Sequence, residues 1–167
     1  MQQALEKFGN DADAFISHIQ EQKYPHLSFS KIYTVETCER RYVLQYIRGI
    51  HPDPMPESLL KGKAFHKMAA AYYRSNGRFV GSAELCDVGL SEYTGTHYQH
   101  LKNAAEVLLQ QKWYGHEILG VERAFVMLLG VDLPPLVGVI DLILKQNSSL
   151  VIVDHKTGRD FYQPEPL

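Results

Sequence analysis

Two aspartates and a lysine are the residues of this chain whose types and spacing best suit chemistry. Asp141 lies in one apolar run of the sequence, and Asp154 and Lys156 lie in the next. Each acid stands beside branched aliphatic residues, where an unpaired carboxylate is costly to bury. Two carboxylates and an ammonium on one sheet face suit metal-assisted hydrolysis of a phosphodiester. The alternative is an acid at a strand end that faces water or forms a salt bridge with a lysine.

The turn between the two runs determines how these residues meet. The runs, 136–144 and 150–156, flank the polar segment 146–149, and this pattern predicts a β-hairpin. With the middle two residues of that segment as the loop, Asp141 stands directly opposite Asp154, with Cβ atoms about 4.5–5.5 Å apart. The repulsion between two carboxylates at that distance must be offset, and a divalent cation with oxygen ligands is the simplest way to offset it. The lysine two residues beyond the second acid projects from the same face.

A histidine and a glutamate upstream are further candidates for the same site. Gly62 and His66 are one helical turn apart, so the glycine would let another backbone approach while the imidazole reaches a metal over the sheet. Alone, His66 is more simply a half-buried helix residue, but beside the two aspartates we favour the metal ligand. Glu122 either joins the acidic cluster, directly or through a metal-bound water, or pairs with a surface base such as Arg123.

Local basic groups are the candidates for contact with nucleic acid. Arg40 and Arg41 precede Tyr42, an arrangement that suits phosphate contact and base stacking. A solvated helix face with tyrosines in the core explains the same residues equally well. Lys63 belongs to a second basic group, which would contact the phosphates along a nucleic-acid backbone if it borders the same cleft. The formal net charge of −2 gives no global basic signature, so binding would depend on such patches and on a bound metal.

Composition indicates an ordinary globular protein. The 167 residues predict one domain, and a 45% hydrophobic share with 22% charged residues is typical of soluble proteins. No apolar run is long enough to cross a membrane, and the N-terminus lacks the layout of a signal peptide, so we expect a cytoplasmic protein. The two cysteines, Cys38 and Cys86, make no disulfide framework, and each is expected to be a small buried residue.

Helices are predicted before strands, which indicates the α+β class with a three-stranded antiparallel meander. Periodic apolar residues predict helices, with 81–89 left ambiguous, at about 12–20, 28–48, 57–75 and 91–114. A strand over 119–129 precedes the hairpin. The candidate core residues of the last three helices are Tyr33, Val35, Cys38, Tyr42, Val43, Tyr46, Ile47, Phe65, Met68, Ala69, Tyr72, Leu101, Ala105, Leu108 and Trp113. The expected parts are 1–27 (extension), 28–118 (helical), 119–157 (sheet with metal site) and 158–167 (tail).

Taken in order, these motifs resemble the RecB-type branch of the PD-(D/E)XK nuclease superfamily, which includes AddB-like and CRISPR-adaptation nucleases. The matching elements span roughly residues 28 to 158. They are Ser28-x-Ser30, Cys38-Glu39-Arg40-Arg41-Tyr42, Gly62-x-x-x-His66, Glu122, Gly138-Val139-Ile140-Asp141 and Asp154-His155-Lys156-Thr157-Gly158.

The resemblance implies a restriction-endonuclease-like core and a role for each matching position. His66, Asp141 and Asp154 would hold Mg²⁺ or Mn²⁺, with the backbone carbonyl of His155 as a further ligand. Lys156 matches the catalytic lysine of the family. The implied activity is a metal-dependent deoxyribonuclease, acting as an exonuclease or a DNA-processing enzyme in repair, recombination or phage metabolism.

Two departures from the family pattern accompany the resemblance. The family core continues with a helix that carries a Gln-x-x-x-Tyr motif and then a strand, whereas Gln163 is followed four residues on by Leu167. The resemblance therefore implies that a further segment or a partner chain completes the fold. Iron–sulfur members carry a cysteine at the place of Cys38 and three more beyond the nuclease motifs, so no cluster is expected here.

Two other classes remain alternatives. One is a catalytically silent nuclease-like module that binds nucleic acid or a partner protein. The other is an unrelated small-molecule hydrolase with a carboxylate metal site.

Overall fold

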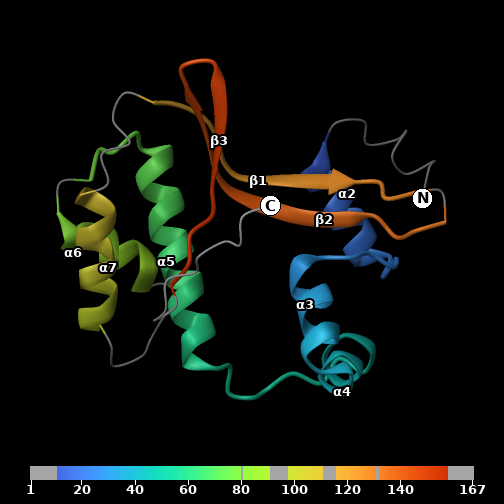
Figure 1. The fold of residues 1–167 in the computed structure, drawn as a ribbon. Helices are drawn as coiled ribbons and strands as arrows, with labels where there is room; N and C mark the ends of the chain where they lie inside the picture. Colours follow the sequence, from blue (N-terminus) through green and yellow to red (C-terminus); the bar gives the residue numbers. More distant parts are fainter. Residues whose placement is uncertain (1–10, 80, 91–97, 111–115, 131, 158–167) are drawn as a thin grey trace. The chain divides into compact units, whose positions relative to one another are not determined.

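The chain folds as six α-helices and a short π-helix followed by a three-stranded antiparallel sheet, counted over the residues that the structure describes (Figure 1). This computed structural model describes residues 11–79, 81–90, 98–110, 116–130 and 132–157. The sheet has the strand order β1-β2-β3. The predicted α+β class, with helices before strands, is confirmed.

The contacts within the chain separate it into two compact units. The first unit comprises Met1–Asp53 and Glu122–Ile140, and the second comprises Pro54–Val121 and Asp141–Leu167. Both long strands, β1 (Glu117–Met127) and β2 (Leu136–Gln146), therefore contribute residues to each unit.

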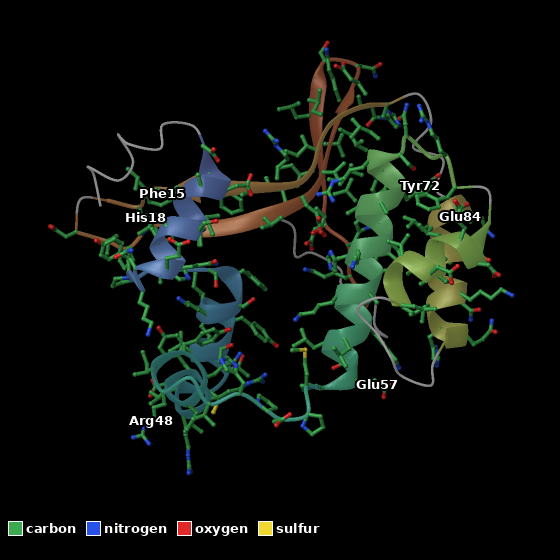
Figure 2. All side chains as sticks on the ribbon, turned by 180° about the vertical axis from the view of Figure 1, so that it is seen from behind. Phe15, His18, Arg48, Glu57, Tyr72 and Glu84 are labelled. Carbon is green, nitrogen blue, oxygen red and sulfur yellow. The ribbon has the colours of Figure 1, made fainter. Side chains whose placement is uncertain are left out.

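In the first unit, α2 (Ala12–Glu21) packs on strand residues through its apolar face. Phe15 and Ile19 are buried against Val137, and Phe15 is labelled on this helix in Figure 2. The side chain of Asp11 caps the helix by accepting the Ala14 N–H at 2.9 Å, as a short acid at an N-cap commonly does. The predicted helix at 12–20 is confirmed.

The single helix predicted over 28–48 is wrong, because the structure has three short pieces there. They are α3 (Phe29–Thr37), α4 (Glu39–Tyr42) and a π-helix (Val43–Ile47). Cys38 interrupts them with an extended backbone (φ −162°, ψ 101°), and its Sγ accepts the Arg41 N–H at 3.4 Å. This thiol therefore caps the start of α4, where an intrahelical acceptor is missing.

The ends of that helical region were predicted correctly. The hydroxyl of Ser28 accepts the Lys31 N–H at 3.3 Å and caps α3. Gly49, at φ +67°, lies just past the C-cap in the left-handed region that favours glycine.

The candidate core residues predicted for the same region do not form a buried face. Tyr33, Val35, Val43 and Ile47 are exposed, and so is Cys38. The break and the change from α to π hydrogen bonding alter the angle between successive side chains. Residues at regular spacing in the sequence therefore do not line up on one side.

In the second unit, α5 (Glu57–Arg74) confirms the helix predicted at 57–75. Pro56 occupies its N-cap, and Glu57 in the first turn suits the positive end of the helix dipole. At the other end, Asn76 (φ 57°) and Gly77 (φ 74°) turn the chain, and the Gly77 N–H donates to the Tyr72 carbonyl at 3.0 Å.

The core of this unit lies between α5, α6 (Ser82–Leu90), α7 (Tyr98–Gln110) and the hairpin. These three helices lie side by side in Figure 1, and α6 settles the ambiguous segment 81–89 as helical. The predicted core residues Met68, Ala69, Tyr72, Leu101, Ala105 and Leu108 are buried, together with Cys86. Trp113 and both ends of the helix predicted at 91–114 lie outside the described residues.

The hairpin has the predicted register. Leu142 pairs with Val153 and Gln146 with Ser149, so residues 147 and 148 form the loop, and Asn147 has a φ of 55°. However, β3 (Ser149–Val153) ends three residues before the predicted end of the strand. The ladder therefore stops one pair short of the two aspartates.

Glycine-to-alanine substitutions at two helical positions should have opposite effects. A Cβ on Gly62 would meet the Thr157 Oγ1 at 3.6 Å, an ordinary contact, so Gly62→Ala should stabilise α5 by about 0.5–1 kcal/mol. A Cβ on Gly89 would lie 2.9 Å from the Met68 Cγ and 3.2 Å from the Ala64 carbonyl oxygen. Gly89→Ala should therefore destabilise by about 1–3 kcal/mol.

Urea unfolding of both variants checks this pair. Equal urea midpoints of unfolding for the two variants would contradict the packing of α6 on α5. A destabilised Gly62→Ala would instead restore the expectation, made from the sequence, that this glycine allows a close backbone approach.

Candidate active site

The Asp141 carboxylate is the centre of the candidate site in the second unit. Its Oδ1 lies 3.2 Å from the His66 Nδ1, and its Oδ2 accepts the His155 N–H at 2.7 Å. The side chain of Asp141 is only 14% exposed, so both contacts hold an acid that is largely removed from water. Since a buried carboxylate is costly without such partners, these contacts explain how the strand tolerates it.

Local structure positions each partner. His66 projects from α5, whose neighbouring residues Ala64 and Met68 are buried in the core. Asp141 belongs to β2, and the next residue, Leu142, is fully buried and paired with β3. Packing of the helix and the strand therefore fixes the imidazole and the carboxylate independently of their mutual contact.

His155 is held by two aromatic side chains of α5. Its ring stacks on that of Tyr73, with centroids 5.7 Å apart and planes at 11°, and meets the edge of Phe65 at 5.7 Å. Its Nε2 is buried and has no hydrogen-bond partner in the described part of the chain. Burial lowers the pKa of His155, and the charge on His66 lowers it further, while Asp141 and Asp154 raise it.

The lowered pKa of His155 predicts a pH dependence of stability. Because the folded pKa lies below the unfolded value of about 6.5, the unfolded chain binds the proton more readily. This contribution to stability is present above about pH 6.5 and is lost as the pH falls toward the folded pKa. His155→Phe keeps a ring against Tyr73 and cannot charge, so its melting temperature should fall less steeply between about pH 7 and pH 5.

Melting curves in EDTA check this, with the exposed His51→Phe as the matched control. The same pH slope in the unmutated chain and in His155→Phe would refute the buried neutral histidine.

Asp154 and Lys156 form an exposed ion pair. The Lys156 Nζ lies 2.8 Å from one carboxylate oxygen of Asp154 and 3.1 Å from the other. These residues lie past the end of β3, so the prediction that they continue the strand is wrong. The salt bridge that the sequence left open as an alternative for this lysine is present.

His66 and Asp141 fit a divalent ion as neighbouring ligands. Their ligand atoms are 3.2 Å apart, and two adjacent ligands of an octahedral Mg²⁺ lie about 3 Å apart, because each is about 2.1 Å from the ion. No group of three His, Cys, Asp or Glu side chains that could hold a metal occurs among the described residues, and Asp154 is paired with Lys156. Mg²⁺ commonly takes one or two carboxylates and keeps several waters, so the pair suits it.

Four of the remaining candidates belong to the first unit, and Lys63 belongs to the second. Arg40 and Arg41 are exposed on α4 of the first unit, and Tyr42 is half-buried beside Tyr46, with ring centroids 5.4 Å apart. Glu122, also of the first unit, has a φ of 48°, which is uncommon for a residue other than glycine. Lys63 is exposed on α5 in the second unit.

Two features of the structure were missed from the sequence. One is the aromatic packing around His155, for which Phe65 and Tyr73 carried no signal beyond helical periodicity. The other is a pocket in the first unit around Lys31, described below. The adjacent Tyr24-Pro25-His26 turn is the one sequence signal for it, because a proline fixes the backbone there.

Comparison with known proteins places the chain in a class. The family model described as the PD-(D/E)XK nuclease superfamily matches residues 26–166, and the chain belongs to this superfamily. No curated protein and no solved structure matches it. Among the described residues, no helix is long and apolar enough to cross a membrane.

Proposed function

We propose that this chain is a divalent-metal-dependent deoxyribonuclease of the RecB-type branch. Membership of the nuclease superfamily supports phosphodiester hydrolysis and nucleic-acid binding. DNA as the substrate, Mg²⁺ or Mn²⁺ as the ion, and exonuclease or DNA-processing action in repair, recombination or phage metabolism are the finer parts of the proposal. A partner chain that contributes to the site also belongs to it.

The observation that carries the proposal is the contact between His66 and Asp141. A histidine from α5 and an acid from β2, 75 residues apart in the chain, meet at 3.2 Å with the Asp154-x-Lys156 motif immediately after β3. Each of these residues was selected from the sequence for the same site. Their meeting in one unit supports a common function more than any single motif does.

Each residue has a proposed role. His66, Asp141 and the backbone carbonyl of His155 would hold the ion, and Asp154 would join them by leaving Lys156. A bound divalent ion supplies an activated water and stabilises charge on the phosphate. The Lys156 ammonium donates to the attacking water or to a phosphate oxygen, and it provides positive charge where negative charge develops. Before metal and substrate bind, Asp154 holds this ammonium in an ion pair.

Cleavage of end-labelled single- and double-stranded DNA with Mg²⁺, with Mn²⁺ and with EDTA tests the proposal. We expect cutting with either metal and none with EDTA, and the product ladder reports polarity. No cutting on either substrate, with metal bound, would reject catalysis by this chain alone.

A catalytically silent module that binds nucleic acid or a partner is the second candidate. The ion pair of Asp154 with Lys156 favours it, because this carboxylate already has a cationic partner and completes no group of three metal ligands among the described residues. No change in melting temperature at millimolar Mg²⁺ or Mn²⁺, together with no cleavage, would support the silent module.

A further inference from the structure

The first unit contains a pocket that the proposed catalysis does not use. Its volume is about 510 Å³, within the range of small-ligand sites. The lining comes from the end of α2, the turn that follows it, α3, the end of α4, the π-helix and Pro134. Its polar and aromatic side chains are Gln20, Lys23, Tyr24, His26, Lys31, Tyr42 and Tyr46.

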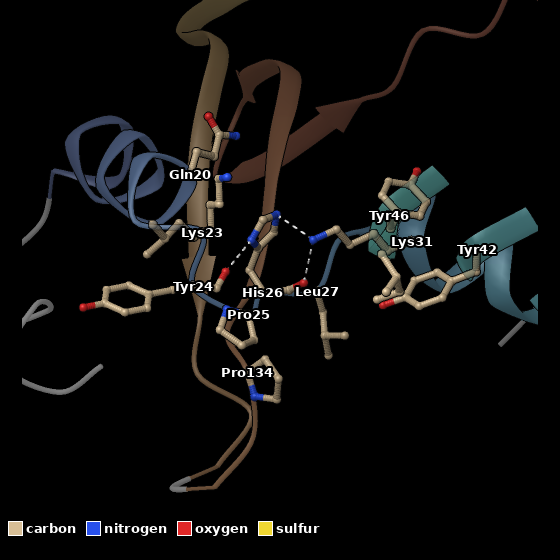
Figure 3. A pocket seen from close by; sticks show the side chains of 12 residues that line it. Gln20, Lys23, Tyr24, Pro25, His26, Leu27, Lys31, Tyr42, Tyr46 and Pro134 are labelled. Atoms are coloured by element: carbon tan, nitrogen blue, oxygen red, sulfur yellow. Dashed lines mark hydrogen bonds between the residues drawn. The ribbon is translucent and has the colours of Figure 1, made fainter. Parts of the chain in front are cut away.

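Lys31 is fixed at the wall of this pocket by two neutral acceptors. Its Nζ lies 2.9 Å from the His26 Nε2 and donates to the His26 carbonyl at 3.1 Å (Figure 3). The His26 Nδ1 lies 3.1 Å from the Tyr24 carbonyl, which can only accept. Nδ1 therefore carries the proton, and Nε2 is left as the acceptor for the ammonium.

The ammonium lacks a counter-ion in the described part of the chain. Two of its three N–H groups are used by His26, and no carboxylate forms an ion pair with it among the described residues. Burial lowers the pKa of Lys31, so the protein partly desolvates this charge without neutralising it. An anion in the pocket would supply the missing charge and the third acceptor.

Aromatic rings stand beside this cation. The Lys31 Nζ lies 5.8 Å from the centroid of the Tyr46 ring, and the Tyr42 ring is 5.4 Å from that of Tyr46. In Figure 3 both rings lie on the side of Lys31 away from His26. Tyrosine faces accept nucleic-acid bases of any kind, while lysine ammonium groups bind phosphate.

We propose that this pocket binds one nucleoside phosphate unit, with its phosphate on Lys31 and its base against Tyr42 or Tyr46. Lys23, which also lines the pocket, is a second cation for the phosphate. The choice of a nucleotide over another aromatic anion rests on the proposed nuclease function. This nucleoside phosphate has two sources with the same chemistry: it is either part of a DNA strand or a free nucleotide.

Calorimetric titration of the full chain in EDTA tests this without catalysis. The probes are dTMP, a short oligothymidylate, deoxythymidine and inorganic phosphate. We expect dTMP or the oligonucleotide to bind, and both deoxythymidine and inorganic phosphate to bind at least about tenfold more weakly. Binding of the oligonucleotide alone assigns the pocket to a strand, and binding of dTMP alone assigns it to a free nucleotide.

Variants tie the binding to the pocket. Lys31→Met should weaken it about 10–100-fold and Tyr46→Leu about tenfold, whereas Tyr46→Phe keeps the ring and should bind normally. Lys145→Met removes the same charge from an exposed hairpin position outside the pocket and should have no effect. If Lys31→Met proves unfolded, Lys23→Met takes its place as the charge variant.

The outcomes separate this pocket from the proposed catalysis. Nucleotide binding that is insensitive to Lys31→Met and Tyr46→Leu, no binding of any probe, or binding of inorganic phosphate as tight as that of dTMP would overturn the inference. Loss of DNA cleavage with nucleotide binding retained would count against the nuclease alone. Cleavage by a chain that binds none of the probes in EDTA would count against the pocket alone.

Discussion

Asp141→Asn should abolish the response of the protein to divalent metal while leaving it folded. An asparagine oxygen can still accept the His155 N–H, now bonded to Asp141 at 2.7 Å, but the charge that would attract an ion is gone. We expect metal affinity to fall by at least about 100-fold, and DNA cleavage with it. Melting curves with increasing Mn²⁺ measure this, because a ligand that binds only the folded state raises the melting temperature.

Asp141→Ala separates binding from folding at the same position. It removes the acceptor as well as the charge, and so leaves the His155 N–H without its partner. We expect this variant to lose about 1–3 kcal/mol of stability in EDTA, more than Asp141→Asn loses. Asp132→Asn, at an exposed position, is the charge-matched control and should keep both metal response and cleavage. Full cleavage by Asp141→Asn would remove this acid from the proposed site.

The hairpin shows what local sequence determines well. A two-residue polar loop between two apolar runs fixed the register of β2 and β3. Side chains alternate between the two faces of a strand, so a slip of one residue would turn the buried apolar side chains toward solvent. The helix ends are likewise determined by residues close by in the sequence. In the structure Ser28, Gly49 and the Asn76-Gly77 pair form these ends through side-chain capping or a positive φ.

The parts that failed depend on contacts distant in the chain or on unusual backbone conformations. Periodicity did not reveal the extended Cys38, because the thiol competes with the helix through a capping bond of its own. Similarly, β3 ends at Val153 because His155 packs against Phe65 and Tyr73 of α5 and gives its N–H to Asp141. Pattern rules within one segment cannot anticipate that choice.

The residues of the candidate site could therefore be predicted from the sequence, whereas the contacts among them could be predicted only in part. Opposed carboxylates were expected from the register, and the register is confirmed. Yet the two acids contact different partners: Asp141 contacts His66 and His155, and Asp154 contacts Lys156. Two adjacent carboxylates repel, so each is more stable beside a cationic group or an N–H donor than beside the other.

Lys156→Ala should remove DNA cleavage and leave stability almost unchanged. The side chains of Lys156 and Asp154 are 62% and 64% exposed, so their ion pair contributes only about 0–1 kcal/mol to stability. In the proposed reaction the ammonium stabilises charge that develops on the phosphate, and loss of one such group typically costs about 10²–10³-fold in rate. Single-turnover cleavage with saturating Mn²⁺ measures the rate, and melting curves confirm that metal still binds.

Lys145→Ala is the matched control for that substitution. Lys145 is also an exposed lysine of the second unit in an ion pair, with Glu117 at 3.4 Å, so it loses the same charge and a similar contact. If the lysine acts on the phosphate, only Lys156→Ala loses cleavage. If instead both variants slow cleavage equally, the effect is a general weakening of attraction between the chain and DNA, and Lys156 has no special role. Because that weakening falls as salt rises, repeating both assays at higher ionic strength distinguishes a reacting group from a steering charge.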